Sequence, residues 1–145
     1  SGRVVIRDVI VSVAPILYVT GVKWLVERPR PITSVGSGLL PGDPSFPSGH
    51  TAAAVIVSVM MILIVRNFAR SRFPDGEDDE RANRRRVFLR RAIIGAVALV
   101  VAVACSRLLL GLHYPTDVII SATICPLISY AVWCVWNACE SAEEW

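Results

Sequence analysis

The chain has 145 residues, of which 54% are hydrophobic and only 19% are charged. This composition excludes a disordered chain, which needs low hydrophobicity and a high density of charge, and it is poorer in charge than an ordinary soluble domain. The formal net charge of +3 is too small to indicate an acidic partner such as nucleic acid. The length suits a single domain that spans residues 1–145.

Four uncharged, apolar segments lie between clusters of charge. The last has the roughly 18 apolar residues that define a candidate transmembrane helix, and the second and third reach about 28–30 Å when they are extended to residues 48–66 and 91–110. Burial in a water-soluble helical protein is the alternative, but four such segments leave too little amphipathic surface to cover a soluble bundle. We therefore expect an all-α fold, a membrane helical bundle of about four transmembrane helices. The segments are residues 9–22, 51–65, 92–105 and 118–138.

The main polar insertion, residues 66–91, lies between the second and third apolar segments. It contains nine arginines against five acidic residues, which gives it a net charge of +4. Because short basic loops stay on the inner side of a membrane, we expect residues 66–91 to form an Arg-rich cytoplasmic loop. The basic run is interrupted by an acidic stretch and its aromatics do not interleave productively with the arginines, so nucleic acid is not favoured. The acidic stretch lacks the spacing of a calcium-binding loop.

The position of this loop predicts the orientation of the other helices. The helix before the loop runs inward from Ser48, and the helix after it returns outward and ends near Arg107. The two remaining connections, residues 23–50 and 107–117, then fall on the same extracytoplasmic face. We expect an integral protein of the cell membrane whose active site lies on that face.

The ionisable residues of these two connections are the candidates for function, because charge at the edge of a membrane is costly to keep. Both histidines of the chain are among them. A structural network of salt bridges is the alternative interpretation. Two histidines, four cations and a carboxylate at one face instead favour a site for an anion. The residues are Lys23, Arg28, Arg30, His50, Arg107, His113 and Asp117.

The local chemistry favours phosphate as that anion. Ser48 is a natural N-cap for the helix that follows it, and the free N–H groups of a helix N-terminus bind phosphate. Gly49 lets a ligand approach the backbone closely. Cationic side chains can supply positive charge to several phosphoryl oxygens. Those at this face are Lys23, Arg30 and Arg107.

A second group of residues has the character of a nucleophile and its partners. Pro115 suits the first turn of a helix, which places His113 just before that helix and Asp117 about one turn later. A carboxylate there can hold one imidazole nitrogen and leave the other free to attack. His50 is the candidate that donates a proton to the leaving oxygen.

Three motifs in this order resemble the signature of the type 2 phosphatidic acid phosphatase (PAP2) superfamily. Residues 23–31 match K-x6-R-P, residues 47–50 match P-S-G-H, and residues 106–117 match S-R-x5-H-x3-D. P-S-G-H alone would be a weak signal, but all three parts with their internal spacing are specific. The apolar segments set the chain apart from the soluble members, which include acid phosphatases and vanadium haloperoxidases.

The resemblance implies a phosphatase that needs neither metal nor cofactor. By motif position His113 would be the nucleophile that forms a phosphohistidine, with Asp117 orienting it, while His50 would protonate the leaving group and then activate water. Arg28 is outside the matched positions, which leaves it as a supporting or headgroup residue. The residues implied to bind phosphate are Lys23, Arg30, Ser48, Gly49 and Arg107.

The resemblance also suggests a substrate class. We expect hydrolysis of a lipid phosphomonoester or pyrophosphate from the bilayer, with undecaprenyl or another polyprenyl pyrophosphate leading and phosphatidylglycerol phosphate or phosphatidic acid as further candidates. The partners expected are this substrate and membrane lipids, not nucleic acid. The Gly- and Pro-rich residues 32–46 suit either a lid over the site or a plain connector.

Two alternatives to a self-contained enzyme follow from the same features. A non-catalytic subunit or scaffold that binds lipid phosphate is one, although every motif position is filled. A transporter is disfavoured because the charges gather at one end and not along a path. Members of this family often have six transmembrane helices where this sequence supports four. The chain is therefore either a short or trimmed member, or one packed against neighbouring copies in a homo-oligomer.

The four cysteines lie in or beside the apolar segments. Their spacing is that of neither a zinc site nor a redox motif. We expect buried free thiols, with no metal site and no disulfide framework. The cysteines are Cys105, Cys125, Cys134 and Cys139.

Overall fold

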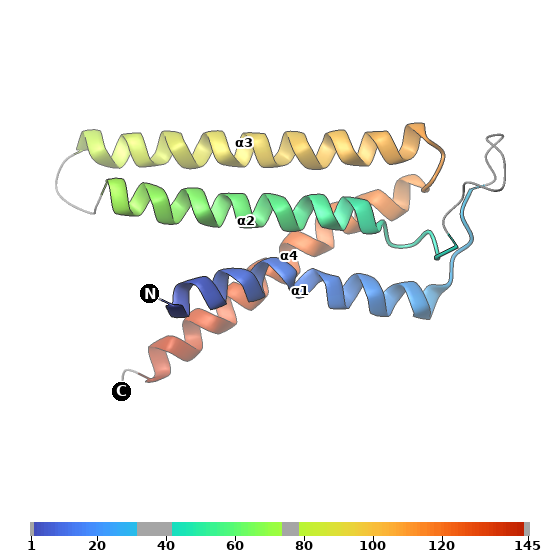
Figure 1. Cartoon of the computed structure of the whole chain (residues 1–145), viewed down its shortest axis with the longest axis horizontal. Helices are drawn as coiled ribbons and strands as arrows, with labels where there is room; N and C mark the ends of the chain where they lie inside the picture. Colours follow the sequence, from blue (N-terminus) through green and yellow to red (C-terminus); the bar gives the residue numbers. More distant parts are fainter. Residues whose placement is uncertain (1, 32–41, 74–78, 144–145) are drawn as a thin grey trace.

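The computed structural model describes residues 2–31, 42–73 and 79–143, and four helices make up most of them (Figure 1). Each helix is long and apolar enough to cross a membrane. The expected all-α bundle of four candidate transmembrane helices is confirmed. Most of the predicted lid or connector, at residues 32–41, lies outside the described residues. The helices are α1 (Gly2–Val26), α2 (Gly49–Arg72), α3 (Asp79–Leu109) and α4 (Pro115–Glu143).

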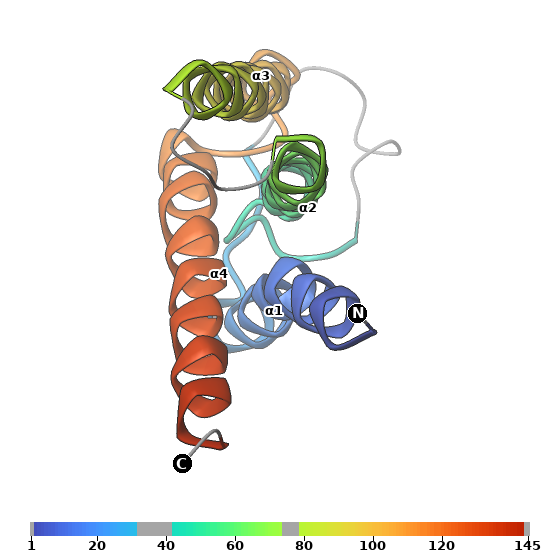
Figure 2. The same ribbon diagram turned by 90° about the vertical axis from the view of Figure 1, so that its left-hand side faces the viewer.

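Helices α2 and α3 run side by side, and α1 lies on the other side of α2 (Figures 1 and 2). Helix α4 starts near the end of α3 and crosses the bundle obliquely, in contact with α1 and α2. The connections that carry the motifs therefore meet at one end of the bundle. The end of α2, the start of α3 and both ends of the chain lie toward the other end.

The apolar side chains of the helices point mostly outward. Within the most apolar stretch of each helix, only 11% to 33% of the residues are buried inside the protein. A small core of Val19, Ala52, Val55 and Cys125 joins α1, α2 and α4. Outward apolar surface of this extent lacks a favourable partner in water but has one in lipid. The four helices therefore fit an integral membrane protein.

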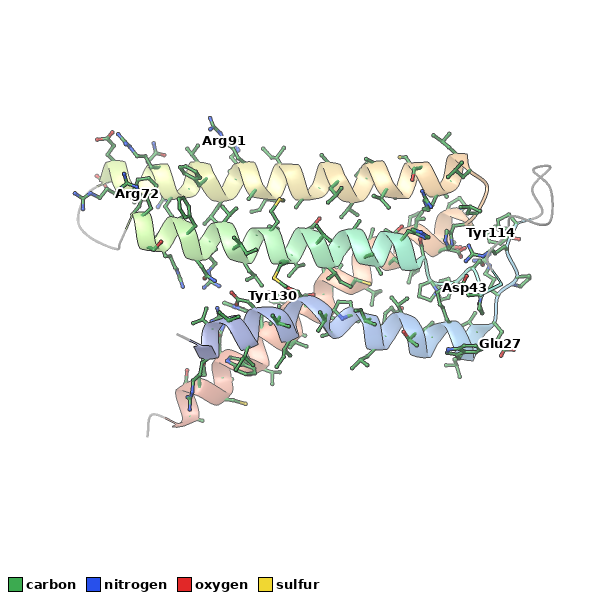
Figure 3. All side chains as sticks on the ribbon, in the orientation of Figure 1. Glu27, Asp43, Arg72, Arg91, Tyr114 and Tyr130 are labelled. Atoms are coloured by element: carbon green, nitrogen blue, oxygen red, sulfur yellow. The ribbon has the colours of Figure 1, made fainter. Side chains whose placement is uncertain are left out.

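The prediction of a loop over residues 66–91 is wrong for most of that segment. Helix α2 continues to Arg72 and α3 already begins at Asp79, so only residues 73–78 connect them. Arginine, the commonest residue of this segment, is a good helix former whether or not lipid surrounds it. The negative charges of Asp79 and Glu80, in the first turn of α3, also interact favourably with the positive N-terminal end of the helix dipole. Arg72 and Arg91 lie at this end of the molecule, away from the motifs (Figure 3).

The expectation of buried thiols holds for one cysteine only. Cys125 is fully buried in the core, whereas Cys105, Cys134 and Cys139 are exposed as free thiols. The sequence does not show which cysteines point toward the protein interior, because the helices are apolar on all sides. The three exposed thiols lie on the outer surface of α3 and α4.

A buried ion pair within α1 is hydrogen-bonded to α2 at the end away from the motifs. Arg7 donates from Nε and Nη2 to Asp8 Oδ1, at 2.9 and 2.8 Å. Asn67 Nδ2 of α2 donates to the other carboxylate oxygen, Asp8 Oδ2, at 2.6 Å. The side chains of Arg7 and Asp8 are each only 10% exposed. Asp8 is thus the acceptor that links the two helices.

Replacing Asp8 with alanine is expected to lower the free energy of unfolding by about 3–5 kcal/mol, because it leaves a buried guanidinium without its carboxylate. Thermal unfolding of the purified chain in detergent would measure the change. Glu80→Ala is the control, since Glu80 pairs with Arg84 on the exposed surface of α3 and such pairs contribute about 0.5 kcal/mol or less. Equal losses in the two variants would contradict a linking role for Asp8.

Candidate active site

A tight turn follows α3 and positions the segment that precedes α4. Leu112 N donates to Arg107 O at 3.1 Å, and Gly111 N donates to Leu108 O at 2.9 Å. These two bonds form a Schellman motif, which satisfies the last carbonyl groups of the helix. Gly111 has a φ of 64°, a left-handed conformation that glycine adopts without steric cost. The turn places His113 immediately before α4.

The first turn of α4 fixes the carboxylate of Asp117. Pro115 is the first helical residue, where its missing N–H costs nothing. Asp117 Oδ2 accepts from Tyr114 N at 2.9 Å, as an acidic residue at the third helical position does in a capping box. The side chain of Asp117 is fully buried. Its position is therefore set by the helix start and not by a ligand.

His113 is buried between this carboxylate and an arginine. Its Nδ1 lies 3.4 Å from Asp117 Oδ2 and is buried without a hydrogen-bond partner. Its Nε2 lies 3.3 Å from Arg30 Nη1. Burial, and next the charge of Arg30, lower the pKa of His113 below its ordinary value of 6.5, against the opposing pull of Asp117. At neutral pH the imidazole is then neutral, as a nucleophile must be.

Arg28 holds the other oxygen of Asp117. Its Nη1 donates to Asp117 Oδ1 at 2.9 Å and to Thr116 Oγ1 at 2.7 Å, and its guanidinium lies 4.1 Å from the centre of the Tyr114 ring. Arg28 lies outside the matched motif positions. The alternating Arg-Pro-Arg-Pro sequence was the signal that could have placed Arg28 at the site. A residue before proline is extended, and alternate residues of an extended chain point to one side, here toward the start of α4.

Ser48 ties the start of α2 to the start of α4. Its Oγ accepts from Thr51 N at 3.4 Å, which confirms it as the N-cap. Its N–H donates to Asp117 O at 3.1 Å, and its carbonyl oxygen accepts from Ser121 Oγ at 3.0 Å. Ser48 is fully buried. A direct contact of Ser48 with phosphate therefore stays a prediction.

A cavity of about 310 Å³ brings most of the predicted residues together. The connection after α1, the start of α2 and the segment before α4 all contribute to its lining. Asp117 and Arg107 are not part of the lining. Arg107 Nε donates to the adjacent Ser106 Oγ at 3.1 Å. The lining residues are Lys23, Arg30, Asp43, Gly49, His50, Ala53 and His113.

Asp43 is the charged lining residue that was not predicted from the sequence. Its Oδ2 lies 2.5 Å from Lys23 Nζ and its Oδ1 lies 2.6 Å from Arg30 Nη2. Partial burial acts to raise the pKa of Asp43, but the hydrogen bonds and charges of Lys23 and Arg30 lower it to about 2. The only signal in the sequence was a lone acid in the short stretch before P-S-G-H. Asp43, Glu27 and Tyr114 all lie at this end of the bundle (Figure 3).

The model of the PAP2 superfamily matches residues 6–140. The chain belongs to the PAP2 superfamily. The match extends over all four helices and every residue of the cavity, so the resemblance of the three motifs is confirmed. No curated protein and no solved structure matches the chain significantly. Family membership and four apolar helices fit a membrane phosphatase.

The charge at the cavity of this PAP2 protein comes from side chains. Lys23 and Arg30 are the cations of the lining, and their side chains are only 14% and 8% exposed. Among the residues that the structure describes, no three of the types His, Cys, Asp and Glu lie close enough to hold a metal ion. The arrangement can bind an anion between two cations and present it to a neutral imidazole.

Proposed function

We propose that this PAP2 protein is an integral-membrane lipid phosphatase that acts through a phosphohistidine on His113. The observation that carries the proposal is the placement of His113. It is buried, its Nδ1 faces the fixed carboxylate of Asp117, and its Nε2 faces a cavity lined by a second histidine and two cations. Nucleophile, orienting carboxylate, proton donor and anion-binding groups are thereby provided at one site.

In the first step, Nε2 of His113 attacks phosphorus while the bond from phosphorus to the leaving oxygen breaks. His50, which lines the same cavity, gives a proton to that oxygen. The imidazole of His113 gains positive charge as the bond to phosphorus forms. Asp117 stabilises this charge through Nδ1, because a carboxylate favours the charged form of a neighbouring group.

In the second step, water replaces His113 on phosphorus. His50, now neutral, takes a proton from the water, whose oxygen attacks the phosphohistidine. The bond from phosphorus to Nε2 breaks, and inorganic phosphate leaves with His113 and His50 in their starting states. The transition states of both steps spread negative charge over the phosphoryl oxygens, and Lys23 and Arg30 stabilise it electrostatically. Arg107 joins them if its side chain turns toward the ligand.

The position of the cavity supports a lipid as substrate. The cavity lies at the ends of apolar helices, and its lining includes Ala53, an exposed residue on α2. A phosphate headgroup can enter there while its hydrocarbon chain stays beside the helices. The arginine-rich helix ends lie at the opposite end of the bundle, and the positive-inside rule then supports an extracytoplasmic site. Polyprenyl pyrophosphate is our lead substrate on that face.

We expect the purified chain to release phosphate from lipid phosphates in the presence of EDTA, and orthovanadate to inhibit the release. The cations of the site are side chains, so chelation removes nothing that the reaction needs, while vanadate takes the place of the phosphoryl group. A colorimetric assay of inorganic phosphate would measure both effects. Loss of activity in EDTA with recovery in magnesium would contradict the proposed mechanism.

A panel of substrates separates the remaining alternatives. Undecaprenyl pyrophosphate, phosphatidylglycerol phosphate and phosphatidic acid would be compared at equal surface density in the same detergent. Release from the pyrophosphate alone or fastest would support the lead substrate. Binding of these lipids without any release would instead identify a non-catalytic lipid-phosphate-binding subunit.

A further inference from the structure

Asp43 occupies donors of both Lys23 and Arg30, the two cations that a phosphate group would need. Arg30 has five N–H donors, and two of them are given to Asp43: Nε donates to its carbonyl oxygen at 3.1 Å and Nη2 to its carboxylate at 2.6 Å. Lys23 Nζ donates to the same carboxylate at 2.5 Å and to Pro44 O at 2.6 Å. The two proposed phosphate ligands of the cavity thus already share an anion of the chain.

The same contacts cover the nucleophile. Held by Asp43 on one side, Arg30 directs Nη1 to Leu112 O at 3.0 Å and to His113 Nε2 at 3.3 Å. With the His113 proton on Nδ1, facing Asp117, the lone pair of Nε2 is engaged by Arg30. Four of the five donors of Arg30 therefore point at protein atoms, and phosphorus cannot approach Nε2 until Arg30 moves.

We propose that Asp43 is an internal competitor of the phosphate group, which must displace the Asp43 carboxylate from Lys23 and Arg30 in order to bind. The inference rests on the phosphate site of the proposed function and adds to it a residue that sets its affinity. The Asp43 carboxylate places one oxygen on Arg30 and the other on Lys23, as two oxygens of a phosphoryl group would when they bridge the same two cations. Because the side chain of Asp43 is 51% exposed, it can leave into water at little cost.

The competition affects both substrate binding and product release. Before the reaction, binding is weakened by the fraction of molecules in which Asp43 occupies the cations; if that fraction is about nine-tenths, the apparent dissociation constant is about tenfold above the intrinsic one. After the reaction, Asp43 takes the cations back from inorganic phosphate and so favours release of the product. The pKa of Asp43, at about 2, keeps the carboxylate charged at every pH at which the enzyme is expected to work.

The test is the binding of orthovanadate and inorganic phosphate to the full chain in detergent, measured by isothermal titration calorimetry. Asp43→Asn keeps the shape of the side chain and removes its charge. We expect this variant to bind both anions about tenfold more tightly than the parent chain, and the inhibition constant of phosphate in the turnover assay to fall by the same factor. Asp43→Ala, which removes the acceptor atoms as well, should bind at least as tightly as Asp43→Asn.

The matched control is Glu27→Gln. Glu27 is an exposed acid at the same end of the molecule (Figure 3) that does not line the cavity, so its loss should change affinity by about twofold or less at physiological salt. Unchanged or weaker binding by both Asp43 variants would overturn the proposal and make Asp43 a residue that positions Lys23 and Arg30. If the parent chain and both Asp43 variants bind neither anion, the phosphate site fails and the proposed function with it.

Discussion

Replacing His113 with alanine is expected to lower phosphate release by at least about 10⁴-fold, because it removes the atom that bonds to phosphorus and not merely a binding contact. The residual rate would come from the cations, which can still bind and polarise the substrate. Phosphate release from the best lipid of the panel, in parent and variant at equal concentration, measures the loss. Vanadate binding by calorimetry and the unfolding temperature show whether the rest of the site remains formed.

His50→Ala is the matched comparison, since His50 lines the same cavity but has a different role. With p-nitrophenyl phosphate, whose leaving group needs little help from an acid, His50→Ala should still form the phosphohistidine but hydrolyse it slowly. Acid-labile phosphate on the protein should therefore accumulate in this variant and be absent from His113→Ala. Near-normal turnover by His113→Ala, or labelling of it, would show that the nucleophile lies elsewhere.

The fold was predictable because four apolar segments leave few alternatives in a chain of 145 residues. The ends of the helices were not, since the apolar signal stops at the edge of the bilayer while the helix continues. Residues 66–72 and 79–91 are helical by the intrinsic preference of arginine and alanine, which hydropathy does not detect. Helix faces were equally hidden, because a membrane helix is apolar on the side facing lipid and on the side facing protein.

The candidate site was predictable where spacing along the chain fixes spacing in space. His113 and Asp117 are four residues apart at a helix start, and Gly49 and His50 open another helix, so local geometry alone brings each pair to the cavity. Asp43 belongs to an irregular connection whose path depends on the cations that it meets. Hydrophobic periodicity in the sequence does not predict the contact of Asp43 with these cations.

Buried Ser48 shows a further limit of inference from motifs. A motif position predicts that a residue type is required but does not say whether a ligand or the protein requires it. The contacts of Ser48 run to Thr51, Asp117 and Ser121, so they hold the starts of α2 and α4 together. Fixing these two starts also fixes the separation of His50 and His113, which one phosphoryl group must bridge.

Asp117→Asn is expected to lower turnover by about 10³–10⁴-fold, a loss of the size seen when the orienting carboxylate of a catalytic histidine becomes an amide. Both oxygens of Asp117 accept from donors, Oδ1 from Arg28 and Oδ2 from Tyr114 N. An amide can keep only one of these bonds with its single oxygen. It also carries no charge to stabilise the imidazolium that forms as His113 bonds to phosphorus. Phosphate release and kcat/KM as a function of pH measure these effects.

Arg28→Gln separates the charge of Asp117 from its anchoring. This variant removes the ion pair on Oδ1 but leaves Oδ2, which faces His113, in place, so we expect a loss of only about tenfold. The pH profile supplies a second distinction. Asp117 raises the pKa of His113, so in Asp117→Asn that pKa falls further below its ordinary value, and the acidic limb of kcat/KM should move to lower pH. If Arg28→Gln costs as much turnover as Asp117→Asn and the limb does not move, then Asp117 serves only to hold the start of α4, and another group must balance the charge on His113.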